Sequence, residues 1–91
     1  MDIDTLFNKV KTALLIEGEY HNDMLKLYIY EVLDYMRSAG VPEDVLQSER
    51  IIGAVARGVT DLWNFGSGNG KLSEYFYQRV IQLVKWGVDS E

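Results

Sequence analysis

Apolar residues recur at helical spacing in four segments of this 91-residue chain, and glycine or proline separates each segment from the next. An apolar side chain every three or four residues is typical of an amphipathic helix that packs one face on a core. The pattern predicts an all-α fold, a compact bundle of about four helices with a glycine-rich loop between the last two. We expect residues 1–88 to form one helical domain and residues 89–91 to fray.

The first predicted helix lies before Gly18, which is expected to stop it. Asp4 is expected to cap its start, because a carboxylate there can accept a hydrogen bond from a free backbone N–H. Its apolar stripe comprises Ile3, Leu6, Phe7, Val10 and Leu14.

The second predicted helix begins at Asn22 or Asp23 and ends at Gly40. Its core face is expected to comprise Leu25, Ile29, Val32, Leu33 and Met36. Leu27 and Tyr30 point to the opposite side, among charged residues. Because a helix that is apolar on both sides usually contacts something on both, these two residues are candidates for an interface.

The third predicted helix is capped by Ser48 and is expected to have small residues on its outer face. Its core face comprises Ile51, Ile52, Val55, Ala56, Val59, Leu62 and Trp63, and its outer face comprises Gly53, Ala54 and Gly58. Arg57 and Asp61 are four residues apart and can form an ion pair. A glycine inside a helix costs roughly 1 kcal/mol relative to alanine. Either a neighbouring backbone approaches closely here, or the helix simply tolerates its glycines.

A glycine-rich loop at residues 65–71 precedes the fourth predicted helix, which Ser73 is expected to cap. Its core face comprises Leu72, Phe76, Val80, Leu83 and Val84. The loop differs from a phosphate-binding loop, because a helix precedes it and Leu72 directly follows Lys71. We interpret it as a flexible connector that becomes ordered against a partner.

The composition argues against several classes of function. A formal net charge of -5 and a pI of about 4.7 oppose broad binding to nucleic acid or to an anionic membrane surface. The chain has no apolar run of membrane-spanning length, and its first residues are acidic, unlike a signal peptide. We therefore expect a soluble intracellular protein, for which the absence of cysteine is also suitable.

Charge is unevenly distributed along the chain. Residues 1–49 contain ten acidic and four basic side chains, whereas residues 50–91 contain four acidic and five basic ones. This asymmetry is either chance in a short sequence or the sign of two unlike faces that meet head to tail.

No constellation of residues points to catalysis. His21 is the only histidine, cysteine is absent, and no spacing supplies several converging metal ligands or a Ser-His-Asp set. We therefore predict no enzymatic activity, no cofactor and no metal. Among the tyrosines, Tyr28 and Tyr35 are assigned to the rim of the core, and Tyr30 and Tyr77 to an interface.

Two motifs carry a resemblance to a known family. The more specific one is Leu62-Trp63-Asn64-Phe65-Gly66 together with Gly70-Lys71-Leu72-Ser73-x-Tyr75-Phe76-x-x-Arg79-Val80, and the looser one is Val10-Lys11-x-x-Leu14-x-Ile16. In these motifs and in its helical layout the chain resembles the small head–tail connector, or head-completion adaptor, proteins of long-tailed bacteriophages.

The resemblance implies an all-helical structural subunit that forms a ring beneath the portal and bridges it to the tail. The implied partners are further copies of the chain, as a dodecamer in the virion, the portal protein, and the next head-completion or tail protein. DNA would pass through without specific binding, and no membrane is involved. The implied location is the head–tail junction of the virion, and the host cytoplasm during assembly.

The interface is expected to join an apolar ridge on one subunit to a shallow face on the next. The candidate residues are Leu27, Tyr30, Gly53, Arg57, Gly58, Phe65, Gly66, Gly68, Gly70, Lys71, Tyr77 and Arg79. The acidic first half would face Arg57 or Arg79 of the neighbouring chain. The alternative function is a small helical protein–protein interaction or regulatory module. A helix-turn-helix DNA-binding protein is opposed by the charge balance.

Overall fold

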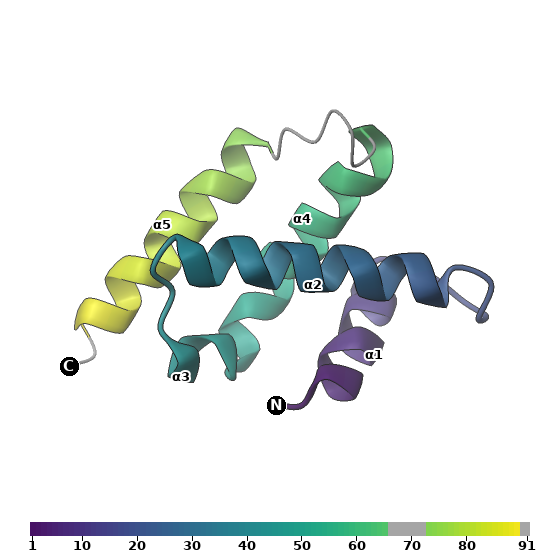
Figure 1. Ribbon diagram of the computed structural model, residues 1–91, viewed down its shortest axis with the longest axis horizontal. Coiled ribbons are helices and arrows are strands. Elements are labelled where there is room, and N and C mark those ends of the chain that lie inside the picture. Colours follow the sequence, from purple (N-terminus) through teal and green to yellow (C-terminus); the bar gives the residue numbers. More distant parts are fainter. Residues whose placement is uncertain (66–72, 90–91) are drawn as a thin grey trace.

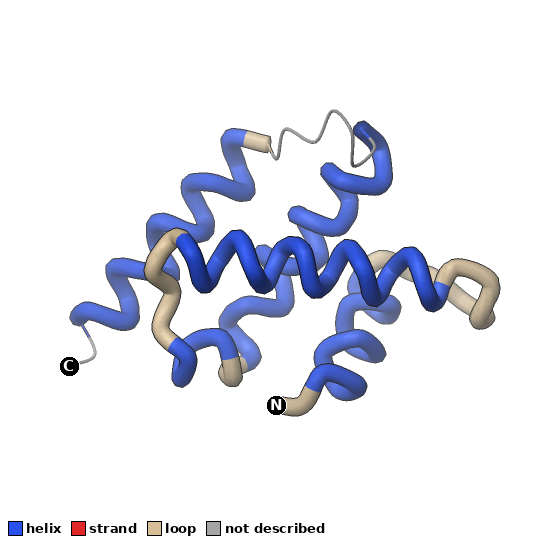
Figure 2. The backbone as a smooth tube through the Cα atoms, viewed as in Figure 1, coloured by secondary structure: helices blue, strands red, loops and turns tan. Residues whose placement is uncertain are grey.

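The computed structural model describes residues 1–65 and 73–89, and the described residues form helices and loops without a strand (Figure 2). The helices are α1 (Ile3–Ala13), α2 (Asn22–Ser38), α3 (Glu43–Leu46), the 3₁₀ turn η1 (Glu49–Ile51), α4 (Ile52–Phe65) and α5 (Glu74–Asp89). The predicted all-α bundle is confirmed, with four longer helices. The single turn α3 follows Pro42, whose fixed backbone angle suits the start of a helix.

The central helix is α4, which packs on α1, α2 and α5. Figure 1 shows α2 crossing in front of α4. In the same view α1 lies towards the N-terminal end of α2 and α5 towards its C-terminal end. The central position of α4 requires an apolar and small-sided helix, and Ala54, Ala56 and Val59 are all buried. The most apolar of the four longer helices thus lies at the centre of the bundle.

One hydrophobic core joins the four longer helices. The residues expected in this core are all at most 2 % exposed: Leu25, Ile29, Val32, Val55, Val59, Leu62, Phe76, Val80 and Leu83. Met36, Val41 and Val45 extend the core under α3. These nine residues are confirmed in the core, because their burial follows directly from their helical spacing. The other residues predicted for the same core faces include four that are only partly buried, Leu33, Ile52, Trp63 and Val84, and Leu72, which lies outside the described residues.

The predicted outer face of α4 is wrong at Ala54 and Gly58. Ala54 is 1 % exposed, and a Cβ atom on Gly58 would lie 2.7 Å from Cε1 of Phe76 and 2.9 Å from Cγ2 of Val32. Gly58 therefore lies where α2 and α5 both approach α4. Periodicity within α4 could not show that a second helix covers this side as well.

At α2 the C-terminal end agrees with the sequence, but the N-cap is His21, without a side-chain hydrogen bond, rather than Asn22 or Asp23. Gly40 has φ of 102°, and the N–H groups of Gly40 and Val41 donate to the carbonyls of Arg37 and Met36, as in a Schellman motif. At α1, by contrast, Asp2 rather than Asp4 is the cap, accepting a hydrogen bond from the Thr5 N–H at 2.7 Å. Hydrogen bonding by Thr5, first by its side chain and then by this N–H, lowers the pKa of Asp2.

The first helix also ends earlier than expected, at Ala13 rather than at Gly18. Leu15 adopts a positive φ of 58°, and its N–H donates to the Thr12 carbonyl. Lys11 then donates to the carbonyl of Gly18 and to the side chain of Asn22, so that its ammonium group joins α1, the following turn and the start of α2.

Candidate interaction surfaces

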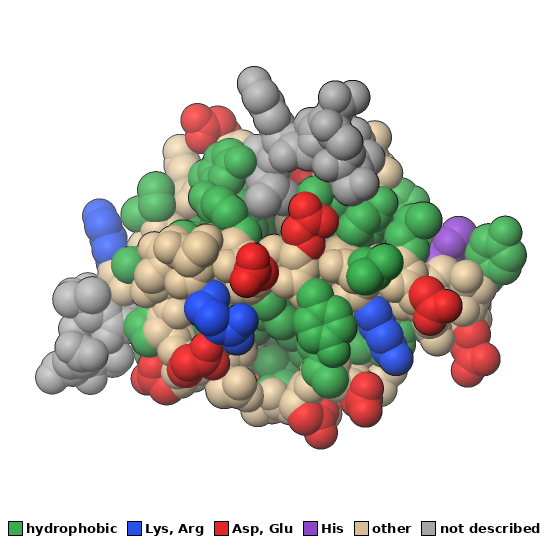
Figure 3. All heavy atoms as spheres, in the orientation of Figure 1, with side chains coloured by type: hydrophobic (Ala, Val, Ile, Leu, Met, Phe, Trp, Pro, Cys, Tyr) green, Lys and Arg blue, Asp and Glu red, His purple; other side chains and the backbone are tan. Residues whose placement is uncertain are grey.

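The side of α2 opposite its buried stripe is exposed. We call it the α2 face and define it by Asp23, Lys26, Leu27, Tyr30, Leu33, Asp34 and Arg37. Leu27 is 67 % exposed and Tyr30 is 53 % exposed, as the sequence predicted. Figure 3 shows acidic and basic side chains on both sides of a hydrophobic middle along α2. The α2 face therefore combines apolar contact area with charges of both signs.

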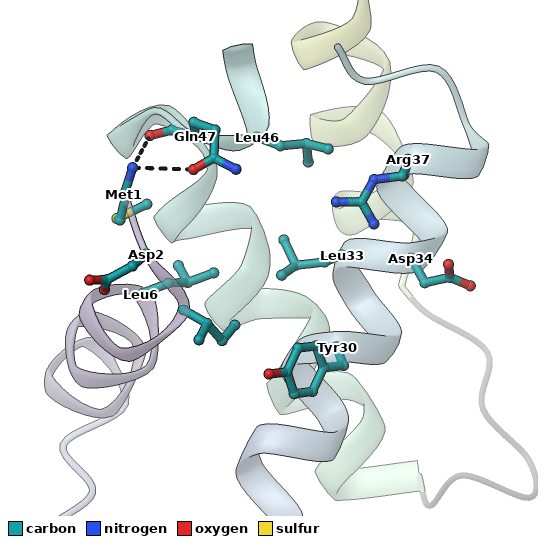
Figure 4. A pocket seen from close by; sticks show the side chains of 10 residues that line it. Met1, Asp2, Leu6, Tyr30, Leu33, Asp34, Arg37, Leu46 and Gln47 are labelled. Atoms are coloured by element: carbon teal, nitrogen blue, oxygen red, sulfur yellow. Dashed lines mark hydrogen bonds between the residues drawn. The ribbon is translucent and has the colours of Figure 1, made fainter. Parts of the chain in front are cut away.

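A groove of about 480 Å³ runs beside the α2 face, between α2 and the N-terminal end of α1 (Figure 4). In Figure 4, Tyr30 and Leu33 point across it towards Leu6, whereas Asp34 points away from it. At the far wall the ammonium group of Met1 donates to the backbone carbonyl and the side-chain oxygen of Gln47, both at 3.2 Å. The groove has an apolar floor and a polar rim.

A second groove of about 330 Å³, here called the α2–α5 groove, lies between the C-terminal part of α2 and α5. The residues that shape it are Tyr35, Ala39, Tyr77, Ile81, Val84 and Lys85. The rings of Tyr35 and Tyr77 are 5.6 Å apart between centroids, and burial raises the pKa of Tyr35 so that its phenol stays neutral. Ile81 is 54 % exposed beside them. This groove is almost entirely apolar, with Lys85 at its rim.

The start of α5 is held by a polar joint to α4. Asp61 is only 3 % exposed, and its carboxylate accepts a hydrogen bond from the Ser73 N–H at 3.0 Å. Arg57 lies 3.5 Å from the same carboxylate, which confirms the predicted ion pair. Ser73 caps α5 as expected, accepting from the Phe76 N–H at 3.2 Å. These bonds satisfy the charge of a buried carboxylate, which would otherwise be costly.

The structure brings together some of the predicted interface residues. Gly53 and Arg79 line one shallow hollow of about 290 Å³ with Tyr75, and the guanidinium of Arg57 lies over the Tyr75 ring. A Cβ atom on Gly53 would meet nothing within 4 Å, so the hollow is open at that position. Arg79 also donates to the side chain of Gln82 at 2.9 Å.

Other predicted residues lie elsewhere or cannot be placed. Gly58 is buried in the core and is not part of any surface. Tyr77 is half-buried against Tyr35 and Phe76, and it reaches a surface only as one wall of the α2–α5 groove. The predictions for the Phe65 side chain and for Gly66, Gly68, Gly70 and Lys71 fall outside the described residues.

The α2–α5 groove was not predicted from the sequence. Tyr35 was assigned to the rim of the core, and Tyr77 and Ile81 share a side of α5. A signal was present, because these aromatic and aliphatic residues recur at helical spacing beside the core face. The sequence does not show that α2 and α5, which are far apart along the chain, lie side by side.

The described residues contain neither a cluster of metal ligands nor a membrane-spanning helix. Residues 1–65 and 73–89 contain no group of three His, Cys, Asp or Glu side chains that could hold a metal ion. His21 packs edge-on against Tyr20 and Trp63, with ring centroids 4.7 and 4.9 Å apart. None of the helices in this part of the chain is both long and apolar enough to cross a bilayer.

Comparison of the chain with protein-family models, with curated proteins and with solved structures found no match.

Proposed function

We propose that this protein is a ring-forming head–tail connector of a long-tailed phage, a structural subunit without catalytic activity. The observation that carries the proposal is the exposure of two unlike apolar surfaces on one small domain. The α2 face presents Leu27 and Tyr30, and the α2–α5 groove presents Ile81 beside two half-buried tyrosines. Heterologous contacts that close into a ring need two different surfaces on each subunit.

Charge supports a head-to-tail order of these contacts. Glu31 and Asp34 are exposed near Leu27 and Tyr30, whereas Lys85 is exposed at the rim of the α2–α5 groove. Pairing of these two carboxylates with the Lys85 ammonium gives the contact a preferred orientation. The α2–α5 groove replaces the outer face of α4 as the receiving surface, because Gly58 and Ala54 are buried.

The remaining partners follow from the resemblance. They are the portal protein above the ring and the next head-completion or tail protein below it. The proposed location is the head–tail junction of the virion, with assembly in the host cytoplasm. A net charge of -5 also suits a conduit for DNA, because like charges repel phosphate and oppose adhesion.

Assembly on the portal tests this function. We expect the purified chain to form rings on the portal protein of the same phage, visible by electron microscopy. The double variant Leu27→Asp, Tyr30→Asp should keep its helicity by circular dichroism, because both side chains are more than half exposed, but should lose ring formation. In the phage, loss of the gene should leave filled heads without tails. Tailed particles in its absence would rule out the connector function.

The alternative is a small helical interaction module that binds a single partner. The exposed α2 face favours it, because one amphipathic surface is sufficient for one protein contact. The size of the assembly separates the two functions. A module would form a one-to-one complex and no ring on the portal.

A further inference from the structure

The α2 face has a symmetric pattern of charges. Its residues lie three, four and seven positions to either side of Tyr30, which places all of them on one side of a helix with 3.6 residues per turn. On the N-terminal side stand Leu27, Lys26 and Asp23, and on the C-terminal side stand Leu33, Asp34 and Arg37. Going outward from Tyr30, Lys26 and then Asp23 follow on the N-terminal side, and Asp34 and then Arg37 on the C-terminal side. At equal distances from Tyr30 the two sides therefore carry opposite charges.

We infer that the α2 face binds the same face of a second copy of this chain, with the two α2 helices antiparallel about a two-fold axis at Tyr30. Such a contact is isologous, so every pair of unlike residues occurs twice. The occupant of this surface is thereby a second copy of the protein. The inference goes beyond the proposed ring, whose contacts are heterologous.

The pairing brings opposite charges together at each position. A two-fold axis at Tyr30 places Lys26 opposite Asp34 of the second copy and Asp23 opposite its Arg37. All four of these side chains are exposed. Arg37 uses its Nε for Glu43 at 2.6 Å, which leaves the terminal nitrogens of the guanidinium for another carboxylate. A parallel pairing in register would instead place each charge against its own copy.

The apolar residues match in the same arrangement. Tyr30 comes opposite Tyr30 of the second copy at the axis, and Leu27 and Leu33 lie about 60° to either side of it, at the two margins of the contact. Leu33 is half-buried at the edge of the groove beside α2, and Leu27 is 67 % exposed. The groove beside Leu33 thus lies along one margin of the contact.

The size of the surface predicts a weak dimer. The 17 residues of α2 span about 25 Å at 1.5 Å per residue. One helix pair of this length buries less than the roughly 800 Å² per partner of a standard interface. We expect association in the micromolar to millimolar range, weakened by salt because it depends on charge pairs between side chains that are exposed in the monomer. In this dimer Leu27 and Tyr30 are covered, so it must open before the α2 face contacts any other partner.

Sedimentation of the full chain tests the pairing, from about 10 µM to about 1 mM protein. We expect a monomer–dimer equilibrium for the wild type. Lys26→Glu places two carboxylates together at each of two contacts, and Asp34→Lys places two ammonium groups together. Each variant alone should weaken association by about tenfold or more. An equimolar mixture of the two variants should dimerise again, because each contact then joins opposite charges.

The matched controls carry the same charge changes away from the α2 face. Arg50→Glu and Asp44→Lys alter exposed residues on η1 and α3, and both should dimerise like the wild type. A second measurement uses the absence of cysteine from the chain. Tyr30→Cys should form a disulfide-linked dimer on mild oxidation, whereas Ala13→Cys, at an exposed site on α1, should not.

Three results would overturn the pairing: a wild type that stays monomeric at about 1 mM, single variants that associate as well as the wild type, or a mixture that stays monomeric. The test is independent of the ring. A chain that is monomeric alone but forms rings on the portal would reject the dimer and retain the connector function. A chain that dimerises as described but never assembles on the portal would reject the connector function and retain the dimer.

Discussion

At the scale of single residues, the two glycines within α4 have opposite roles. Gly58 has no room for a side chain, since a Cβ would lie within 3 Å of both Phe76 and Val32. Gly53 on the same helix faces open space. The first glycine is required by tertiary packing, whereas the second is only a poor helix former.

This difference gives a paired prediction. Gly58→Ala should destabilise the protein by about 1–3 kcal/mol, because an aromatic ring and a stiff β-branched side chain must both shift. Gly53→Ala should stabilise it by up to about 1 kcal/mol through helix propensity alone. Urea unfolding of both variants measures the two effects. A Gly58→Ala protein as stable as the wild type would mean that α2 and α5 do not approach α4 this closely.

At the scale of elements, the joint between α4 and α5 depends on Asp61. Its carboxylate is 3 % exposed, accepts the Ser73 N–H and lies 3.5 Å from Arg57. Ser73 directly precedes α5, so the joint fixes where that helix starts relative to α4. The two helices thus share a polar contact at one end and the apolar core along their length.

Asp61→Ala should therefore cost about 1–3 kcal/mol, because the Ser73 N–H loses its acceptor in a partly buried position. We also expect faster amide exchange at Ser73. Glu74→Ala is the control, since Glu74 is exposed and forms no hydrogen bond with the described residues. Chemical unfolding and hydrogen exchange by NMR check both variants. Equal losses in the two proteins would show that the joint does not hold α5.

At the scale of the whole molecule, one core supports four helices, so a single buried charge acts on the entire fold. A domain of 91 residues has a total stability of about 5–14 kcal/mol. An unpaired carboxylate at a fully buried position costs several kcal/mol, in addition to the apolar contacts that are lost. A charge at an exposed apolar residue of α2 does not carry this cost, because the carboxylate stays in water.

Val59→Asp should unfold the protein, whereas Leu27→Asp should leave it folded. Both variants add one negative charge, but Val59 is fully buried and Leu27 is 67 % exposed. Thermal unfolding followed by circular dichroism compares them directly. Cooperative melting of Val59→Asp near the wild-type temperature would contradict a single core, and loss of structure in Leu27→Asp would contradict the exposure of the α2 face.

The sequence alone determined the fold class and the inner face of each helix. Leu25, Ile29 and Val32 are buried because the 3.6-residue period of a helix places them on one side, whatever they pack against. Local chemistry likewise determined the ends at Gly40 and Ser73, since a positive φ or a capping hydroxyl acts within a few residues. The exposure of Leu27 and Tyr30 on the opposite side of α2 follows from the same period.

Only the tertiary structure decided what lies on the second side of α4. Gly58 and Asp61 are spaced like surface residues, yet both are buried, because α2 and α5 approach Gly58 and Ser73 bonds to Asp61. The α2–α5 groove arises in the same way, because Tyr35 and Ile81 are 46 positions apart in sequence and become neighbours only through packing. The spacing of apolar residues indicates only which face of a single helix is buried. The number of helices that meet at a position depends on crossing geometry, which side-chain spacing within a single helix does not encode.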